Sequence, residues 1–168
     1  MPDYEVLGDL PEHRLPTDGP IRQISLVDLD GALHVFAPSD LMLLPQTTLT
    51  EDFVCEEGWS VPRQSWSGVL VEDLLSTAGI AQAEWVEFAA GDYRFTRPMT
   101  EARSELIALM LNGAPISEVH GGPFRLYVPG EACHTSIKWL DRIEVRHLPG
   151  LDTASQIAGQ RLMSREGR

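Results

Sequence analysis

Alternating apolar and polar residues divide most of the chain into short β-strands. The first is expected at 21–29, where Asp30-Gly31 supplies a tight turn and 32–36 returns as its partner. A segment rich in β-branched residues at 47–55 predicts another strand. Further strands are expected at 85–89 and 93–96 (paired around Gly91-Asp92), 106–111 (ended by Asn112-Gly113), 124–128, 137–140 and 143–145.

Helical periodicity is confined to a few short stretches. Pro38-Ser39-Asp40 should open a helix over 41–44, with Ser39 or Asp40 as its cap. An amphipathic helix is predicted over 71–78 and stopped by Gly79, and a helical turn over 98–104. Residues 56–67 are expected to form a loop.

The two ends differ from the middle of the chain. Residues 1–20 are rich in Pro, Asp and Glu and predict an arm that lies over the domain or is partly mobile. Residues 151–168 are compatible with a surface helix or a frayed tail. The organisation expected is therefore an arm (1–20), one domain of 21–150 in the α+β class with mixed sheets and short helices, and a C-terminal tail or helix (151–168).

Composition narrows the classes of function. The 168 residues carry a net charge of −12, which argues against binding to nucleic acid or to an anionic membrane surface. No apolar run approaches the roughly 18 residues that span a bilayer, and the start lacks a basic segment followed by an apolar one, so a cytoplasmic location is expected. An anionic ligand would need a local cationic site set against this acidic background.

Cys55 ends a predicted strand and enters a loop with Gly58 and Trp59, which is a position where a thiolate can face a pocket. From residue type alone, a buried structural cysteine is the favoured interpretation. Cys133 is the other cysteine, and in a reducing compartment both are expected as free thiols.

Two later segments carry candidate anion ligands. In 120–125 the consecutive glycines can expose backbone N–H groups between His120 and Arg125, although Gly-Gly-Pro is also an ordinary turn. In 136–140, Lys138 stands beside Trp139 on a strand-like segment. Taken alone, Lys138 is more simply interpreted as a surface residue than as a ligand for an anion.

Together these segments resemble the molybdopterin-binding domain of the sulfite oxidase family. The resemblance rests on Cys55 with the loop that contains Gly58 and Trp59, on the His-Gly-x-Pro-x-Arg pattern at 120–125, and on the Lys138-Trp139 pair. Trp66-x-Gly68 and Asn112-Gly113-x-Pro115 match as well, so the resemblance extends over about 21–147.

The resemblance implies a sulfite-oxidase-type fold and a site for molybdenum held by molybdopterin. Cys55 matches the metal ligand, and a soft thiolate suits a redox-active metal. His120, Arg125 and Lys138, with Ser136 beside them, match positions that hold the anionic tail of the cofactor. Tyr93 matches a position on the substrate side of the metal. A half-buried strand tyrosine with no role at the site is at least an equally open interpretation.

The implied activity is oxygen-atom transfer on a small substrate, with electrons passed to a separate protein partner. Arg63, Arg94 and Arg97 are candidates for binding the substrate, the arm has no assigned cofactor contact, and Cys133 is expected to be a buried bystander. A non-catalytic carrier of the same fold is the alternative. A thiol enzyme that uses Cys55 with His120 or His134 as base is a third possibility, but it leaves Arg125 and Lys138 unexplained.

Overall fold

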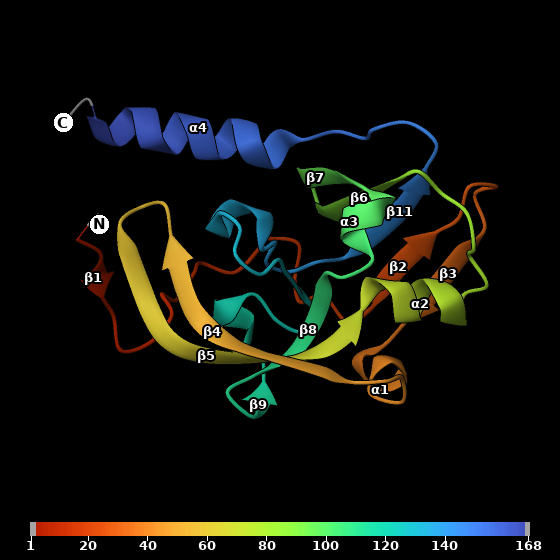
Figure 1. The fold of residues 1–168 in the computed structure, drawn as a ribbon, viewed down its shortest axis with the longest axis horizontal. Coiled ribbons are helices and arrows are strands. Elements are labelled where there is room, and N and C mark those ends of the chain that lie inside the picture. Colours follow the sequence, from red (N-terminus) through yellow and green to blue (C-terminus); the bar gives the residue numbers. More distant parts are fainter. Residues whose placement is uncertain (1–2, 167–168) are drawn as a thin grey trace.

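Two β-sheets form the body of the protein (Figure 1). The structure, a computed structural model, describes residues 3–166. The first sheet holds β1 (Glu5–Val6), β4 (Thr47–Cys55), β5 (Trp59–Leu70), β8 (Leu106–Leu111), β9 (Ala114–Pro115) and β10 (Arg125–Tyr127). The second sheet runs in the order β3 (Leu33–Phe36), β2 (Ile24–Val27), β11 (Arg142–Arg146), β6 (Trp85–Ala90) and β7 (Tyr93–Pro98).

This architecture confirms the predicted α+β class. Both sheets are mixed, because β1 runs parallel to β5 and β2 runs parallel to β11 while the other pairs are antiparallel. The strands expected before residue 56, between 85 and 111, at 124–128 and at 143–145 are present with small shifts at their ends.

The loop predicted over 56–67 is wrong. The chain reverses within Glu56–Gly58, where Gly58 takes a left-handed φ of 96°, and β5 begins at Trp59 opposite Cys55. Pro62 favoured a loop because it lacks the N–H that a strand ladder needs. It is accommodated where the β4–β5 register slips between Glu51 and Phe53, so the hairpin continues past it.

The strand predicted over 137–140 is also wrong. Trp139 has a left-handed φ of 54°, which interrupts any extended run. The Trp139 N–H donates to the Gly121 carbonyl (2.8 Å) and the Leu140 N–H to the Phe124 carbonyl (2.9 Å). This segment is therefore an irregular strap that ties the glycine loop to the sheet.

The helices are short and lie outside the sheets: α1 (Pro38–Leu41), α2 (Val71–Thr77), α3 (Met99–Ala102) and α4 (Thr153–Glu166), with single 3-10 turns η1 (Glu118–His120) and η2 (Cys133–Thr135). α1 begins three residues earlier than predicted, because proline fits the first helical position. Its N-cap is Ala37, and Asp40 accepts a bond from the Ala37 N–H (2.7 Å) instead of capping. α2 and α3 match their predictions.

Both ends of the chain pack on the body. The arm pairs with β5 through β1, and the His13 N–H donates to the Val119 carbonyl (2.8 Å). The C-terminal segment forms α4, which packs against β7 and η2 and crosses the top of Figure 1. The surface helix, one of two expected alternatives, is the one observed.

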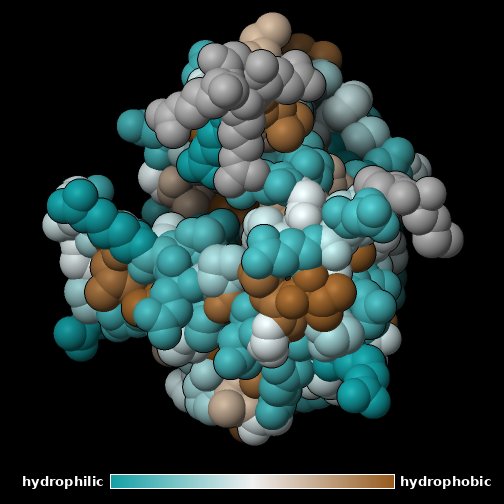
Figure 2. All heavy atoms as spheres, turned by 90° about the vertical axis from the view of Figure 1, so that its left-hand side faces the viewer, coloured by the Kyte–Doolittle hydropathy of each residue, from teal (hydrophilic) through white to brown (hydrophobic). Residues whose placement is uncertain are grey.

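The main core lies between the sheets and includes Leu26, Phe88 and Phe124. A second apolar cluster forms on the β4–β5 hairpin, where Trp66 and Tyr127 stack with ring centroids 4.9 Å apart and Phe53 packs beside them. The face that carries the hairpin tip and the end of α4 is mostly hydrophilic, with scattered apolar groups (Figure 2). None of the helices described combines the length and apolar composition that crossing a bilayer requires.

Candidate functional site

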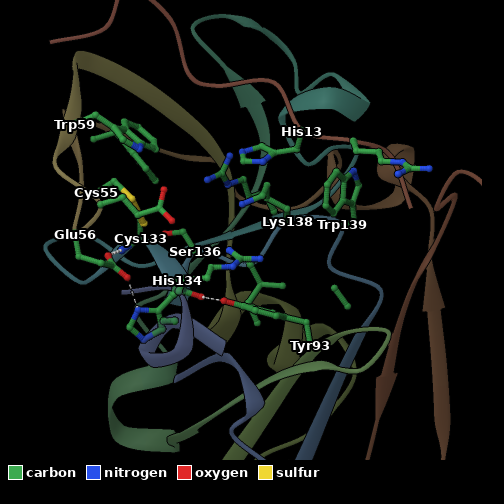
Figure 3. Close-up of a pocket in the computed structure, with 18 of the residues that line it drawn as sticks. His13, Cys55, Glu56, Trp59, Tyr93, Cys133, His134, Ser136, Lys138 and Trp139 are labelled. Carbon is green, nitrogen blue, oxygen red and sulfur yellow. Dashed lines mark hydrogen bonds and ion pairs between the residues drawn. A yellow bond between two sulfur atoms is a disulfide. The ribbon is translucent and has the colours of Figure 1, made fainter. Parts of the chain in front are cut away.

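A cavity of about 360 Å³ opens between the tip of the β4–β5 hairpin, the arm, residues 136–139 and α4. This volume is within the range of small-molecule sites, roughly 300–1,000 Å³. Figure 3 shows the two cysteines on one side of it and His13 and Lys138 on the other. Its polar lining residues are His13, Arg14, Glu56, Glu57, Tyr93, Arg125, His134, Ser136, Lys138 and Arg161.

Cys55 lies at the end of β4, is 1% exposed and lines the cavity. Cys133, at the start of η2, lies next to it with 5.1 Å between the two Cα atoms, and the structure joins them in a disulfide. The prediction of free thiols is therefore wrong in this state, and Cys133 is no bystander. Nothing in the spacing of 78 residues signalled the pairing, because it depends on η2 folding back onto the hairpin tip.

Glu56 fastens η2 to the hairpin turn. One carboxylate oxygen accepts the Cys133 N–H (2.8 Å), and the other lies 2.7 Å from Nδ1 of His134. Burial opposes the charge, but the bonds from His134 and from the backbone hold the pKa of Glu56 below its usual value. Cys55, Glu56 and Cys133 bring potential metal-ligating atoms within 4.8 Å of one another.

Tyr93 reaches the cavity from the start of β7. Its hydroxyl donates to the His134 carbonyl (2.8 Å), as Figure 3 shows. Burial raises the pKa of Tyr93 to about 12, with Arg161 acting in the opposite direction and Glu56 adding to the rise. The hydroxyl therefore keeps its proton at neutral pH.

Arg125 is 4% exposed, and its guanidinium lies over the Phe53 and Trp66 rings, 5.3 and 5.0 Å from their centroids. One of its amino groups donates to the His120 carbonyl (2.9 Å), whereas Nε is buried without a partner. Burial lowers the pKa of Arg125 to about 10. Among the side chains described, those of residues 3–164, no carboxylate forms an ion pair with this guanidinium.

Lys138 is half-buried beside Arg125. Burial, together with the charges of Arg125 and Arg161, lowers the pKa of Lys138 to about 8, while Glu57 raises it. Gly121 leaves room for this side chain, because a Cβ there would lie 2.6 Å from the Lys138 Cβ. Ser136, next along the lining, is buried.

The glycine loop does not offer its N–H groups to an anion. The Gly121 N–H donates to the Glu118 carbonyl (3.1 Å) and the Gly122 N–H to the Ser117 carbonyl (2.9 Å). Within the described chain, the residues lining the cavity do not include His120, whose ring nitrogens lie near Ser117 Oγ and the Leu10 carbonyl. The loop thus holds Arg125 and the arm in place.

Three cationic or polar groups of the site escaped sequence reasoning: His13 and Arg14 from the arm, and Arg161 from α4. Burial and the nearby charges of Lys138 and Arg125 lower the pKa of His13 to about 4, so its ring is neutral at physiological pH. Only the packing of the two ends onto the hairpin and η2 brings these residues to the cavity.

The arginines suggested for substrate binding lie elsewhere. Arg94 pairs with Glu87 (2.7 Å), and Arg97 is surrounded by Glu101, Glu105 and Glu131. Neither of them, nor Arg63, is among the residues lining the cavity of the described chain.

The residues present fit an anionic cofactor that carries a thiophilic metal. A buried Arg125 with an unpartnered Nε and an adjacent lysine provide donors for a negatively charged group. On the opposite side, cysteine sulfur in its reduced form is the ligand that a soft metal prefers.

Comparisons with known proteins agree with this chemistry. The family described as "Oxidoreductase molybdopterin binding domain" matches residues 25–151. The uncharacterized oxidoreductase YuiH of Bacillus subtilis (strain 168) is 30% identical over 141 residues, covering 82% of this chain and 70% of YuiH. The sulfane dehydrogenase SoxCD of Paracoccus pantotrophus has the same fold, with a TM-score of 0.68 at 23% identity over 76% of this chain and 39% of that one.

Larger enzymes are similar over part of their length. A nitrate reductase of Fusarium oxysporum is 33% identical over 95 residues, and the sulfite oxidase of Arabidopsis thaliana is 30% identical over 112. These matches cover 50% and 52% of this chain but only 10% and 28% of the two enzymes. The family match and the similarity to YuiH show that the chain belongs to the sulfite oxidase family of molybdopterin-binding domains, whose cofactor is molybdopterin.

Proposed function

We propose that this chain is a molybdenum-dependent oxidoreductase that transfers an oxygen atom to or from a small substrate. The observation that carries the proposal is the division of one cavity into a sulfur side, with Cys55, and a cationic side, with Lys138. Arg125 also lines the cavity, and its charge acts on Lys138. When bound, the molybdenum cofactor supplies the oxygen-atom and electron transfer. The chain supplies a ligand, an anion site and the surrounding charges.

Cys55 is the proposed metal ligand. In the disulfide form Cys55 is 1% exposed and lines the cavity, so reduction would present its thiolate there. A thiolate in this position completes the sulfur set around a soft metal.

Arg125 and Lys138 are the proposed contacts for the anionic tail. The guanidinium can grip a phosphate with its unused donors while the aromatic rings hold its plane fixed. Lys138, with a pKa of about 8, is mostly protonated at neutral pH, and a bound anion would raise that pKa further. His120 keeps its predicted association with the cofactor only through Arg125, whose guanidinium its carbonyl orients.

The substrate side is proposed to lie near Tyr93 and Arg161. Tyr93 holds a proton on its hydroxyl and can offer it to a substrate oxygen only by releasing the His134 carbonyl. Arg161 is an exposed cation on the lining and suits a small oxyanion. Transfer of electrons to a separate protein partner completes the proposal.

The test is production of the chain in a host that makes the molybdenum cofactor, followed by elemental and pterin analysis. Turnover is then assayed with small oxyanions plus an artificial electron acceptor, and with S- and N-oxides plus a reduced dye. Cys55→Ser should lower turnover by at least 100-fold with the fold unchanged by circular dichroism. Val54→Ser, at an exposed neighbouring position on β4, is the matched control.

Each alternative predicts a different result. A carrier would hold molybdenum and pterin but turn over none of these substrates. A thiol enzyme would show metal-free turnover that alkylation abolishes. Full molybdenum-dependent activity in Cys55→Ser would remove Cys55 from the ligand set.

A further inference from the structure

We propose that Cys55 and Cys133 form a reversible dithiol–disulfide pair whose oxidation closes the metal position. The site is one of redox modification, and its reactants are small disulfides such as oxidised glutathione. The inference rests on the proposed role of Cys55 as the metal ligand.

Cys133 is held beside Cys55 by contacts other than the sulfur–sulfur bond. Glu56, the residue after Cys55, accepts the Cys133 N–H and also bonds to the ring of His134. The turn η2 is further fixed by the Tyr93 hydroxyl on the His134 carbonyl. With 5.1 Å between the Cα atoms, both thiols stay within disulfide reach after reduction.

The two cysteine residues differ in exposure. Cys55 is 1% exposed, whereas Cys133 is half-buried, and both line the cavity. A small disulfide entering the cavity therefore meets Cys133 first. Cys133 is the attacking thiol, and Cys55 is the resolving thiol.

The exchange balances in two steps. The Cys133 thiolate attacks one sulfur of oxidised glutathione, forming a mixed disulfide and releasing one glutathione thiolate. The Cys55 thiolate then attacks the Cys133 sulfur and releases the second. Two cysteine thiols lose two protons and two electrons, and one glutathione disulfide is reduced to two glutathiones.

Cys55 cannot be part of the disulfide and bind the metal at the same time. A sulfur engaged in a disulfide has no thiolate charge to give to a metal, because metal binding requires the deprotonated thiol. The oxidised chain therefore keeps its cationic side but lacks its metal ligand. Reduction is expected to precede stable molybdenum binding.

The pair itself is tested on the full chain without cofactor. Samples are equilibrated at several ratios of reduced to oxidised glutathione, alkylated, and weighed by intact mass spectrometry. We expect two populations, with two labels or with none. A persistent singly glutathionylated species as the main product would overturn the proposed pairing.

The consequence is tested by molybdenum retention. Reduced and oxidised chains are mixed with molybdenum cofactor released from a donor molybdoenzyme, desalted, and analysed for molybdenum and pterin. The oxidised wild type should retain at least tenfold less molybdenum than the reduced wild type, with recovery on adding dithiothreitol. Cys133→Ala, checked for folding by circular dichroism, should retain the same amount under both conditions.

Equal retention by oxidised and reduced wild type would overturn the inference and leave the proposed function standing. An equally large loss of molybdenum on oxidation of Cys133→Ala would also overturn the inference. Oxidation would then act on the chain without any Cys55–Cys133 disulfide. Absence of molybdenum from every form would overturn the proposed function together with the inference.

Discussion

Two buried arginines show how differently this protein uses the same side chain. Arg97 and Arg125 are 8% and 4% exposed, and each lies over an aromatic ring, Phe95 for the first and Phe53 and Trp66 for the second. Arg97 is enclosed by three carboxylates, with Glu105 at 2.5 Å and Glu131 at 3.0 Å. Arg125 has none within ion-pair distance in the described chain, and one carbonyl accepts its hydrogen bond.

The pKa values of the two arginines shift in opposite directions. The carboxylates raise the pKa of Arg97 despite its burial, whereas burial lowers the pKa of Arg125. Removing a charge from water costs free energy unless a partner compensates it. Arg97 is compensated within the chain and is structural. Arg125 is held without its counter-ion and is suited to an anionic ligand.

Breaking the compensated cluster should have the largest effect. Arg97→Met leaves Glu105 and Glu131 without their cation, and removal of one partner from a buried ion pair costs about 3–5 kcal/mol. We expect a loss of that size in the free energy of unfolding, measured by urea denaturation at pH 8. Arg22→Met, which removes an exposed cation, should change it by less than about 0.5 kcal/mol. If Arg97→Met lost less than about 1 kcal/mol, these ion pairs would contribute no more to stability than exposed surface pairs do.

The cluster should also give stability a pH dependence of known sign. Burial raises the pKa of Glu105 to about 7 from 4.5, against the lowering effect of Arg97. Because the folded-state pKa is the higher one, this stabilisation is complete below about pH 4.5 and is lost as pH rises through about 7.

The comparison chain is Glu105→Gln, which cannot ionise at this position. Relative to it, wild type should lose up to about 3 kcal/mol of unfolding free energy between pH 5 and pH 8. Contributions from other groups, including His13 with its lowered pKa, are common to both chains and cancel. Parallel pH curves would mean that Glu105 ionises normally in the fold.

The fold was largely predictable because its signals are local. β4 begins and ends where its β-branched pattern does, and Gly79 and Asn112-Gly113 mark real ends of elements. The errors at 56–67 and 137–140 arose where backbone geometry overrides local pattern: a bulge that admits Pro62, and a left-handed Trp139.

The residues of the candidate site also fall into those that the sequence predicted and those that it did not. Cys55, Arg125, Ser136 and Lys138 were found by resemblance, and they line one cavity. His13, Arg161 and Cys133 were missed because no sequence motif marks them: they reach the cavity only through long-range packing of the arm, α4 and η2. The role of each residue toward the cofactor stays a prediction.

The uncompensated arginine should behave in the opposite way to Arg97. Arg125→Met keeps the apolar stem over Phe53 and Trp66 while removing a buried charge, so the cofactor-free chain should lose less than about 1 kcal/mol of stability. The variant should retain about 10–100-fold less molybdenum and pterin after desalting, because a charge-assisted contact is worth roughly 1.5–3 kcal/mol. Arg22→Met should retain as much as wild type, since only a cation on the lining should matter. If Arg125→Met retained its cofactor but unfolded as readily as Arg97→Met, both arginines would be structural, and Lys138 would have to hold the anionic tail without Arg125.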